Sequence, residues 1–134
     1  MTHTPHASSP SHHDVVIIGG GAAGIAVAAS LLKRRGDLDI AIIEPAESHY
    51  YQPGWTLVGG GVFSDIDTRR SMQNVMPRQA SHYPTHAERV DPQASEVTLA
   101  DGRRLGYTRL VVAPGLVLDW GPSRGSKRPS ASTA

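Results

Sequence analysis

A glycine-rich stretch near the start of the chain constrains the fold more than any other feature. Residues 15–24 read VVIIGGGAAG, so a short run of β-branched apolar residues passes directly into glycines. Gly19, Gly21 and Gly24 have the spacing G-x-G-x-x-G, which binds a pyrophosphate when it follows a strand and opens a helix. In that setting the three glycines allow a tight turn, a close approach of the backbone to the ligand, and close packing of helix on strand. Glycine triplets also occur in plain loops, so the flanking residues must decide.

The flanking residues predict a strand before the glycines and a helix after them. Residues 14–18 contain four consecutive apolar positions, which is typical of a strand buried on both faces of a parallel sheet. Residues 22–35 place apolar side chains at helical spacing, with the small residues Ala22 and Ala23 in the first turn. Three cations occupy the last turn of this helix, and Gly36 is a suitable stop.

A second strand is predicted over residues 38–44, LDIAIIE, and it ends in Glu44, 20 positions after Gly24. A carboxylate at this place accepts hydrogen bonds from the ribose of a bound adenosine. The strand, the glycine turn, the helix and the acid together make a complete βαβ unit, which predicts a bound dinucleotide. An acid rather than a base also disfavours a 2′-phosphate, which leaves FAD or NAD as the ligand.

Composition excludes several other classes of protein. The chain has 134 residues, enough for one domain with its own core, and no cysteine, so it forms no disulfide and no Cys-ligated metal site. A net charge of +1 gives no electrostatic case for nucleic acid. No apolar run is long enough to span a membrane, so we expect no transmembrane segment.

The stretch from residue 45 to residue 64 is rich in aromatic residues, glycine and proline. It predicts a long functional loop, the alternative being a surface loop that packs on its own aromatic side chains. Beyond it we expect a short helix at 68–77 and a strand near 87–90. A hairpin of residues 96–99 and 103–107 should turn at Asp101 and Gly102. Residues 109–113, RLVVA, predict a further buried strand that leads into Pro114 and Gly115.

Both ends of the chain are polar and lack periodicity. We expect residues 1–13 to be a disordered leader, although its histidines, which include His12 and His13, leave metal binding as an alternative. Residues 121–134 are rich in Gly, Pro and Ser and predict a disordered tail. The predicted folded part is therefore residues 14–120, with an α/β, Rossmann-like fold that has a parallel sheet, a βαβ unit and a β-hairpin insertion and is incomplete.

Several blocks resemble one family. The fingerprint DVVIIGGGAAG, the pair Glu44–Pro45 and HYYQPGWTLVGGG at residues 49–61 resemble the N-terminal part of sulfide:quinone oxidoreductases. These are FAD-dependent members of the pyridine nucleotide-disulfide oxidoreductase superfamily. YTRLVVAPG at residues 107–115 resembles the second FAD motif of that superfamily, and LDW at 118–120 also fits. The YQPGWTLVG block is the most specific of these signals.

The resemblance implies FAD as cofactor and a role for each matching residue. The residues that would contact FAD lie in the glycine turn, at the end of the second strand, in the aromatic stretch, in the strand near 87–90 and in the second motif. They are Gly19, Gly20, Gly21, Ala22, Ala23, Gly24, Glu44, Gln52, Val90, Ala113, Pro114 and Gly115. Within that set Gln52 would lie against the flavin side, and Val90 would present its backbone to the adenine. No catalytic residue and no metal ligand is expected in this chain.

In the family, a pair of cysteines reacts with sulfide and the electrons pass through FAD to a quinone. Because this chain has no cysteine, we expect it to be a truncated portion that is inactive by itself. Sulfide and quinone are the implied partners of the full-length family. The expected location is the cytoplasm, with peripheral membrane contact made by parts of the family fold outside this chain.

Two other hypotheses remain open. The chain could be a non-catalytic dinucleotide-binding fragment, which the lack of cysteine favours. It could also be part of an NADH:quinone or disulfide-type reductase, which the YQPGWTLVG block disfavours.

Overall fold

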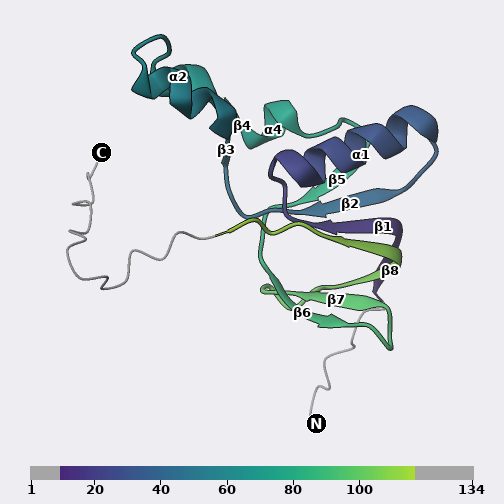
Figure 1. Ribbon diagram of the computed structural model, residues 1–134. Coiled ribbons are helices and arrows are strands. Elements are labelled where there is room, and N and C mark those ends of the chain that lie inside the picture. Colours follow the sequence, from purple (N-terminus) through teal and green to yellow (C-terminus); the bar gives the residue numbers. More distant parts are fainter. Residues whose placement is uncertain (1–9, 117–134) are drawn as a thin grey trace, which may run out of the picture.

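The computed structural model describes residues 10–116 and shows a six-stranded sheet with a small second sheet beside it (Figure 1). The larger sheet has the order β5-β2-β1-β8-β7-β6, in which β5, β2, β1 and β8 are parallel and β7 and β6 continue antiparallel. The α/β fold with a mostly parallel sheet and a hairpin insertion is therefore confirmed. The strands of the large sheet are β1 (Ser11–Ile18), β2 (Ile40–Ile43), β5 (Ala80–Tyr83), β6 (Ala87–Asp91), β7 (Glu96–Leu99) and β8 (Arg104–Val112).

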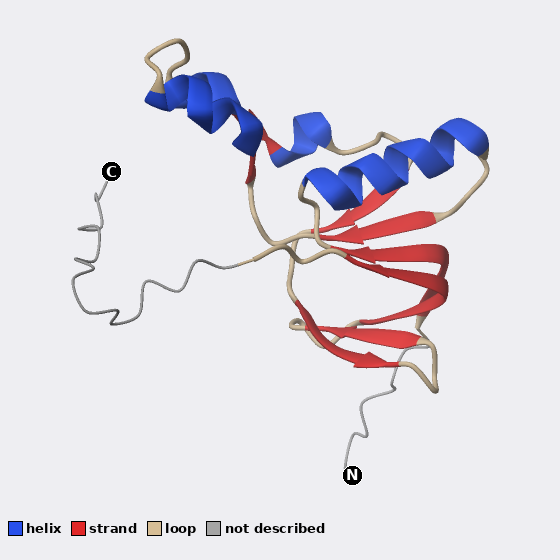
Figure 2. Ribbon diagram, viewed as in Figure 1, coloured by secondary structure: helices blue, strands red, loops and turns tan. Residues whose placement is uncertain are grey.

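The helices lie on one side of the large sheet (Figure 2), and the side chains of the parallel strands are buried on both faces. Helix α1 (Ala22–Arg34) lies on one face, where Ala28 and Leu32 pack against Ile17 and Ile42. On the other face β7 and the start of β8 fold beneath the parallel strands, and their side chains form a second cluster. This lower cluster consists of Val16, Ala41, Ile43, Val97, Leu99 and Leu105, all of them buried. Burial on both faces explains why the second half of β1, residues 15–18, and the whole of β2 are continuous apolar runs.

The βαβ unit forms as predicted, with small shifts at its boundaries. β1 and β2 pair in parallel, Ile18 opposite Ile43, with α1 as the connection. The helix ends at Arg34, one residue before the predicted end, and the amide of Arg35 caps it by donating to the Leu31 carbonyl. Four residues of the predicted second strand, Ile40–Ile43, lie in the sheet and are fully buried.

The predicted disordered leader is wrong for its last three residues, because β1 begins at Ser11. The first residues of β1 have no apolar pattern, and contacts with distant residues stabilise the strand there. His13 is buried: its Nδ1 lies 2.9 Å from the Asp39 carboxylate and its Nε2 lies 3.0 Å from the Tyr83 hydroxyl. Residues 1–9 lie outside the described part of the chain, as do the predicted tail and residues 117–120 of the predicted domain.

The aromatic stretch is not the long loop that the sequence predicts. Its residues form the first half of a unit that projects from the sheet in Figure 1. This projecting unit contains β3 (Ser48–Tyr50), η1 (Gln52–Gly54), α2 (Trp55–Gly59), α3 (Asp65–Thr68), β4 (Arg69–Ser71) and α4 (Met72–Val75). β3 and β4 pair antiparallel and form the second sheet, so the helix predicted at 68–77 is interrupted at its start. After Thr68, which ends α3, only its segment Met72–Val75 is helical, and there Met72 is buried, as an apolar face requires.

The strands after the projecting unit also differ in detail from the prediction. β5 pairs with β2 and was not predicted, since its sequence ASHY has no apolar pattern. The predicted hairpin is confirmed, but its turn has three residues rather than two. Gly102 has a φ of +84°, and the amide of Leu99 donates to the Arg103 carbonyl across the loop.

β8 is one continuous strand, and its end is not the buried strand that the sequence predicts. It pairs with β1 as far as Val112, opposite Ile18. The side chain of Val112 is 63% exposed, because no described residue covers the end of the strand. No helix among residues 10–116 has the length and hydropathy that crossing a bilayer requires.

Candidate functional site

The predicted glycine turn lies at the carboxyl edge of the parallel strands, where β1, β2 and β8 all end. Gly19 follows β1 with a φ of +103°, and its amide donates to the Ile43 carbonyl at 2.9 Å. A Cβ on Gly19 would overlap the carbonyl of Ala113, and a Cβ on Gly24 would overlap the carbonyl of Gly19. Both positions require glycine, because backbone atoms occupy the space that a side chain would need.

Gly21 differs from its two neighbours in the motif. A Cβ at this position would meet no atom within 4 Å, so protein packing does not explain the glycine. Its backbone is extended, with φ −71° and ψ −173°, and it is the N-cap of α1. The open space beside Gly21 is where a close approach of a ligand would need the absence of a side chain.

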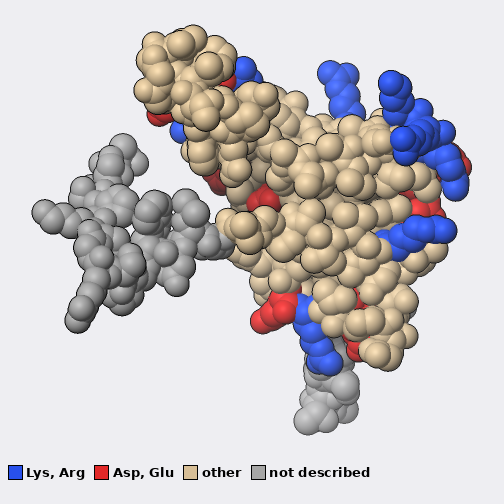
Figure 3. Space-filling model, in the orientation of Figure 1, with Lys and Arg blue, Asp and Glu red and all other residues tan. Residues whose placement is uncertain are grey.

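The first turn of α1 faces the same open space. Ala22 and Ala23 are exposed, no side chain caps the helix, and no acidic residue lies in the first turn. The first amide groups of a helix have no partner within it and carry the positive end of the helix dipole. On the face shown in Figure 3, Lys and Arg gather mainly over the other end of α1, around Lys33 and Arg34. Backbone amides rather than cationic side chains are therefore the donors that a pyrophosphate would meet.

Glu44 follows β2 and is held against the glycine turn. One carboxylate oxygen accepts a hydrogen bond from the Gly20 amide at 2.7 Å, and the other accepts from the Ala46 amide at 2.8 Å. A Cβ on Gly20 would collide with the side chain of Glu44, which explains the middle glycine of the triplet. Each carboxylate oxygen has a second lone pair, so both can still accept a hydrogen bond from a ribose hydroxyl.

The segment after β8 closes the other side of the turn. The amide of Ala113 donates to the Ile18 carbonyl at 2.8 Å, which continues the pairing of β8 with β1. Pro114 and Gly115 are exposed beside the glycine turn, and Gly115 has a φ of +76°. The structure thus brings Gly19 to Gly24, Glu44 and Ala113 to Gly115 together at one edge.

Two of the predicted FAD contacts, Gln52 and Val90, belong to other elements of the fold. Gln52 is exposed in η1 of the projecting unit. Val90 lies in β6, where it pairs with Val97, and its side chain packs against the lower cluster.

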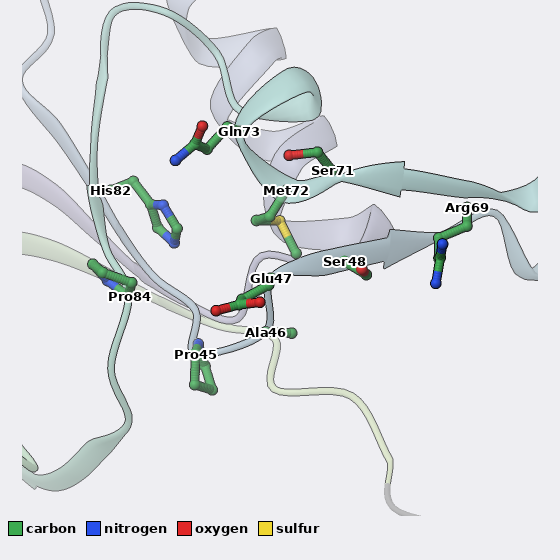
Figure 4. Close-up of a pocket in the computed structure, with 10 residues that line it drawn as sticks. All are labelled: Pro45, Ala46, Glu47, Ser48, Arg69, Ser71, Met72, Gln73, His82 and Pro84. Carbon is green, nitrogen blue, oxygen red and sulfur yellow. The ribbon is translucent and has the colours of Figure 1, made fainter. Parts of the chain in front are cut away.

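Figure 4 shows a cleft that the sequence did not indicate, and one of its lining residues is Pro45, which follows Glu44. It has a volume of about 590 Å³, and its walls come from the loop after β2, from β4 and α4, and from the end of β5. The lining includes Pro45, Ser71, Gln73, His82 and Pro84. Sequence reasoning missed His82 and Pro84 because β5 itself was not predicted. The signal that could have indicated the cleft is a pair of prolines, Pro45 and Pro84, which follow the ends of the adjacent strands β2 and β5.

The projecting unit exposes large apolar side chains, among them Tyr51, Trp55, Val62 and Ile66. A second cleft of about 660 Å³ lies here, between His49, Tyr51, Phe63 and Arg70 among others. The pKa of Asp67 in this unit is lowered, because its carboxylate accepts hydrogen bonds from the amide and the hydroxyl of Ser64. Among residues 10–116, no group of three or more His, Cys, Asp and Glu side chains is arranged to hold a metal ion.

A glycine turn between a buried strand and a helix, an acid at the end of the next strand, and a parallel sheet define a dinucleotide-binding domain of the Rossmann type. Comparison with known proteins gives the family. The model of the family Pyridine nucleotide-disulphide oxidoreductase matches residues 13–121, and the chain belongs to this family. The cofactor is FAD, and the glycine turn and Glu44 fit its ADP half.

Individual relatives point to sulfide:quinone oxidoreductases. The mitochondrial sulfide:quinone oxidoreductase of Dictyostelium discoideum is 42% identical over 107 residues, which cover 78% of this chain and 23% of the relative. The solved sulfide:quinone oxidoreductase of Aquifex aeolicus is 30% identical with a TM-score of 0.69, and the match covers 83% of this chain and 26% of that chain. NADH:rubredoxin oxidoreductase from Clostridium acetobutylicum is less similar, at 25% identity and a TM-score of 0.59 over 78% of this chain and 28% of that one.

The chain thus spans about a quarter of the length of these relatives. It is a sulfide:quinone oxidoreductase-like flavoprotein segment that corresponds to the N-terminal portion of such proteins, which confirms the resemblance noted in the sequence. The alternative of an NADH-linked reductase is supported only by the weaker similarity.

Proposed function

We propose that this chain binds the ADP half of FAD in a flavoprotein that oxidises sulfide and passes the electrons to a quinone. The observation that carries the proposal is the contrast within the glycine turn. Gly19 and Gly24 are glycines because the fold fills the space around them, whereas Gly21 faces open space beside free helix amides. A pyrophosphate on these amides would bring the adenosine ribose of FAD to Glu44.

The redox chemistry of such a protein is supplied by the flavin, and these residues bind and orient the cofactor. Sulfide oxidation of this type also needs thiolate nucleophiles. The 134 residues contain no cysteine, so thiolates would have to come from outside them. We therefore expect the chain by itself to bind FAD without turning over sulfide.

Further parts of the proposal rest on the family alone. Contact of Gln52 with the flavin side and of Val90 with the adenine stay predictions, since both rest on the resemblance of the sequence to the family. Sulfide as donor and a quinone as acceptor follow from the names of the similar proteins. We propose a cytoplasmic location, with peripheral membrane contact made elsewhere in the full-length protein.

The test is FAD binding by the purified chain, followed by visible absorbance and by quenching of flavin fluorescence. Glu44→Ala should weaken FAD binding at least about tenfold, because it removes charge-assisted hydrogen bonds to the ribose that are worth about 1.5 kcal/mol or more. Glu88→Ala is the matched control, since Glu88 is exposed on β6 and outside the proposed site. A chain that takes up no FAD, or an unchanged affinity in Glu44→Ala, would refute the proposed site.

A further inference from the structure

The backbone carbonyl of Glu44 has an uncommon hydrogen-bond partner. The amide of Glu44 donates to the Tyr83 carbonyl at 3.0 Å, which continues the parallel ladder between β2 and β5. The next rung of a parallel ladder would run from the amide of Thr85 to the Glu44 carbonyl. The amide of Thr85 instead donates to the Tyr83 carbonyl at 2.8 Å, and Pro84 has no amide hydrogen. The backbone of β5 therefore offers no donor to this carbonyl.

The side chain of His82 supplies the missing donor. Its Nε2 lies 2.9 Å from the Glu44 carbonyl oxygen, in a partly buried position at the wall of the cleft in Figure 4. A carbonyl oxygen can only accept, so Nε2 must carry the hydrogen in this contact. Both the neutral Nε2–H tautomer and the imidazolium meet this condition, whereas the Nδ1–H tautomer does not.

This hydrogen bond acts on the carboxylate of Glu44 through the chain that follows it. The Glu44 carbonyl belongs to the peptide unit that joins Glu44 to Pro45. The proline ring fixes the φ of Pro45, so only the ψ of Pro45 can turn the next amide, at Ala46, relative to that unit. The amide of Ala46 donates to one oxygen of the Glu44 carboxylate at 2.8 Å. Without His82, rotation of this peptide unit would displace the Ala46 amide and leave the carboxylate held only by the Gly20 amide.

We propose that His82 is a positioning residue for the cofactor site, which holds the Glu44 carboxylate in place for the adenosine ribose through the Glu44 carbonyl. The inference rests on the proposed function, because it concerns the same adenosine site. Glu44 is then fixed by Tyr83 at its amide, by His82 at its carbonyl, and by the amides of Gly20 and Ala46 at its carboxylate.

The experiment measures dissociation constants of the full chain for FAD and for ADP, which shares the adenosine diphosphate of FAD. His82→Leu removes the donor and should weaken both ligands about fivefold, the effect of one hydrogen bond. His82→Gln carries an amide donor at a similar reach and should recover affinity to within about twofold of the wild type. His86→Leu is the matched control, since His86 is exposed and its side chain has no hydrogen bond among the described residues, and it should leave both constants unchanged.

Combining His82→Leu with Glu44→Ala separates this inference from the proposed function. A residue that acts through Glu44 has no further effect once Glu44 is absent, so the double variant should bind ADP like Glu44→Ala alone. Unchanged binding in Glu44→Ala overturns the proposed function itself. Weakened binding in Glu44→Ala, together with full affinity in His82→Leu or an additive loss in the double variant, overturns only the role of His82.

A measurement on the unaltered chain covers the case in which His82→Leu does not fold. The ¹⁵N spectrum of the neutral imidazole, recorded in alkaline buffer, distinguishes the two neutral tautomers. His82 should be the Nε2–H tautomer there, and its ring proton should exchange more slowly with ADP bound. The Nδ1–H tautomer would overturn the inference.

Discussion

Two alanine substitutions in the glycine turn should separate ligand binding from folding. Gly21→Ala adds a methyl group to open space, on backbone that alanine adopts without strain. Gly24→Ala adds the same methyl group against the carbonyl of Gly19, with Ile17 close by. The two variants have the same chemistry and lie three residues apart, so a difference between them reports the surroundings of each position.

The magnitudes follow from those surroundings. In Gly21→Ala, a reduced entropy of the unfolded chain offsets the weaker N-cap, and the free energy of unfolding should change by less than about 0.5 kcal/mol. Its methyl group would hold the pyrophosphate away from the helix amides and weaken FAD by about 2 kcal/mol, roughly thirtyfold. In Gly24→Ala, overpacking costs about 3 kcal/mol against backbone that cannot yield, and helix propensity recovers about 1 kcal/mol.

The assay pairs thermal unfolding of the apo chain with FAD titration by flavin fluorescence. Gly24→Ala should lower the Tm by about 10 °C, as a net loss of about 2 kcal/mol requires for a domain of this size. Gly21→Ala should keep the wild-type Tm and lose FAD affinity. Equal losses of Tm in the two variants, or wild-type FAD affinity in Gly21→Ala, would refute the distinction between a packing glycine and a ligand glycine.

Two further predictions concern the projecting unit and the hairpin. The lowered pKa of Asp67 means that its cap on α3 contributes fully above the ordinary Asp pKa of about 3.9 and is lost as the pH falls through the lower pKa of the folded state. The chemical shift of the Ser64 amide in NMR spectra should therefore change with a midpoint below about pH 3.9, and Asp67→Asn should abolish this change. A midpoint above about pH 3.9 would contradict the lowered pKa of Asp67. Gly102→Ala should lower the free energy of unfolding by about 1 kcal/mol, because φ is +84° there, while Gly59→Ala in α2 should have no such cost. Equal denaturant midpoints for these two variants would argue against backbone strain at Gly102.

The part of the fold that could be predicted is the part governed by local sequence. The apolar runs of β1 and β2, the small residues of α1 and the glycine spacing act within about thirty residues, and together they predicted the βαβ unit and the place of Glu44. The hairpin around Gly102 was predicted for the same reason, since a turn residue with positive φ is a local requirement.

The parts that could not be predicted depend on contacts between distant residues. His13 is polar and follows an aperiodic stretch, yet Asp39 and Tyr83 pair with its ring and allow it to be buried in the sheet. β4 forms because β3 lies opposite it, although its sequence RRS has no strand signal. The role of His82 was likewise invisible, because it depends on β5 lying next to β2.

The order of the strands explains why one edge carries the whole candidate site. β1 lies between β2 and β8 and is parallel to both, so the loops that follow the three strands must meet. Gly19 is fixed from both sides in this arrangement, by the Ile43 carbonyl on the side of β2 and by the close approach of Ala113 on the side of β8. A change in the pairing of either neighbour would alter the glycine turn directly. The geometry of the cofactor site is therefore a property of the sheet, and the glycine sequence alone does not determine it.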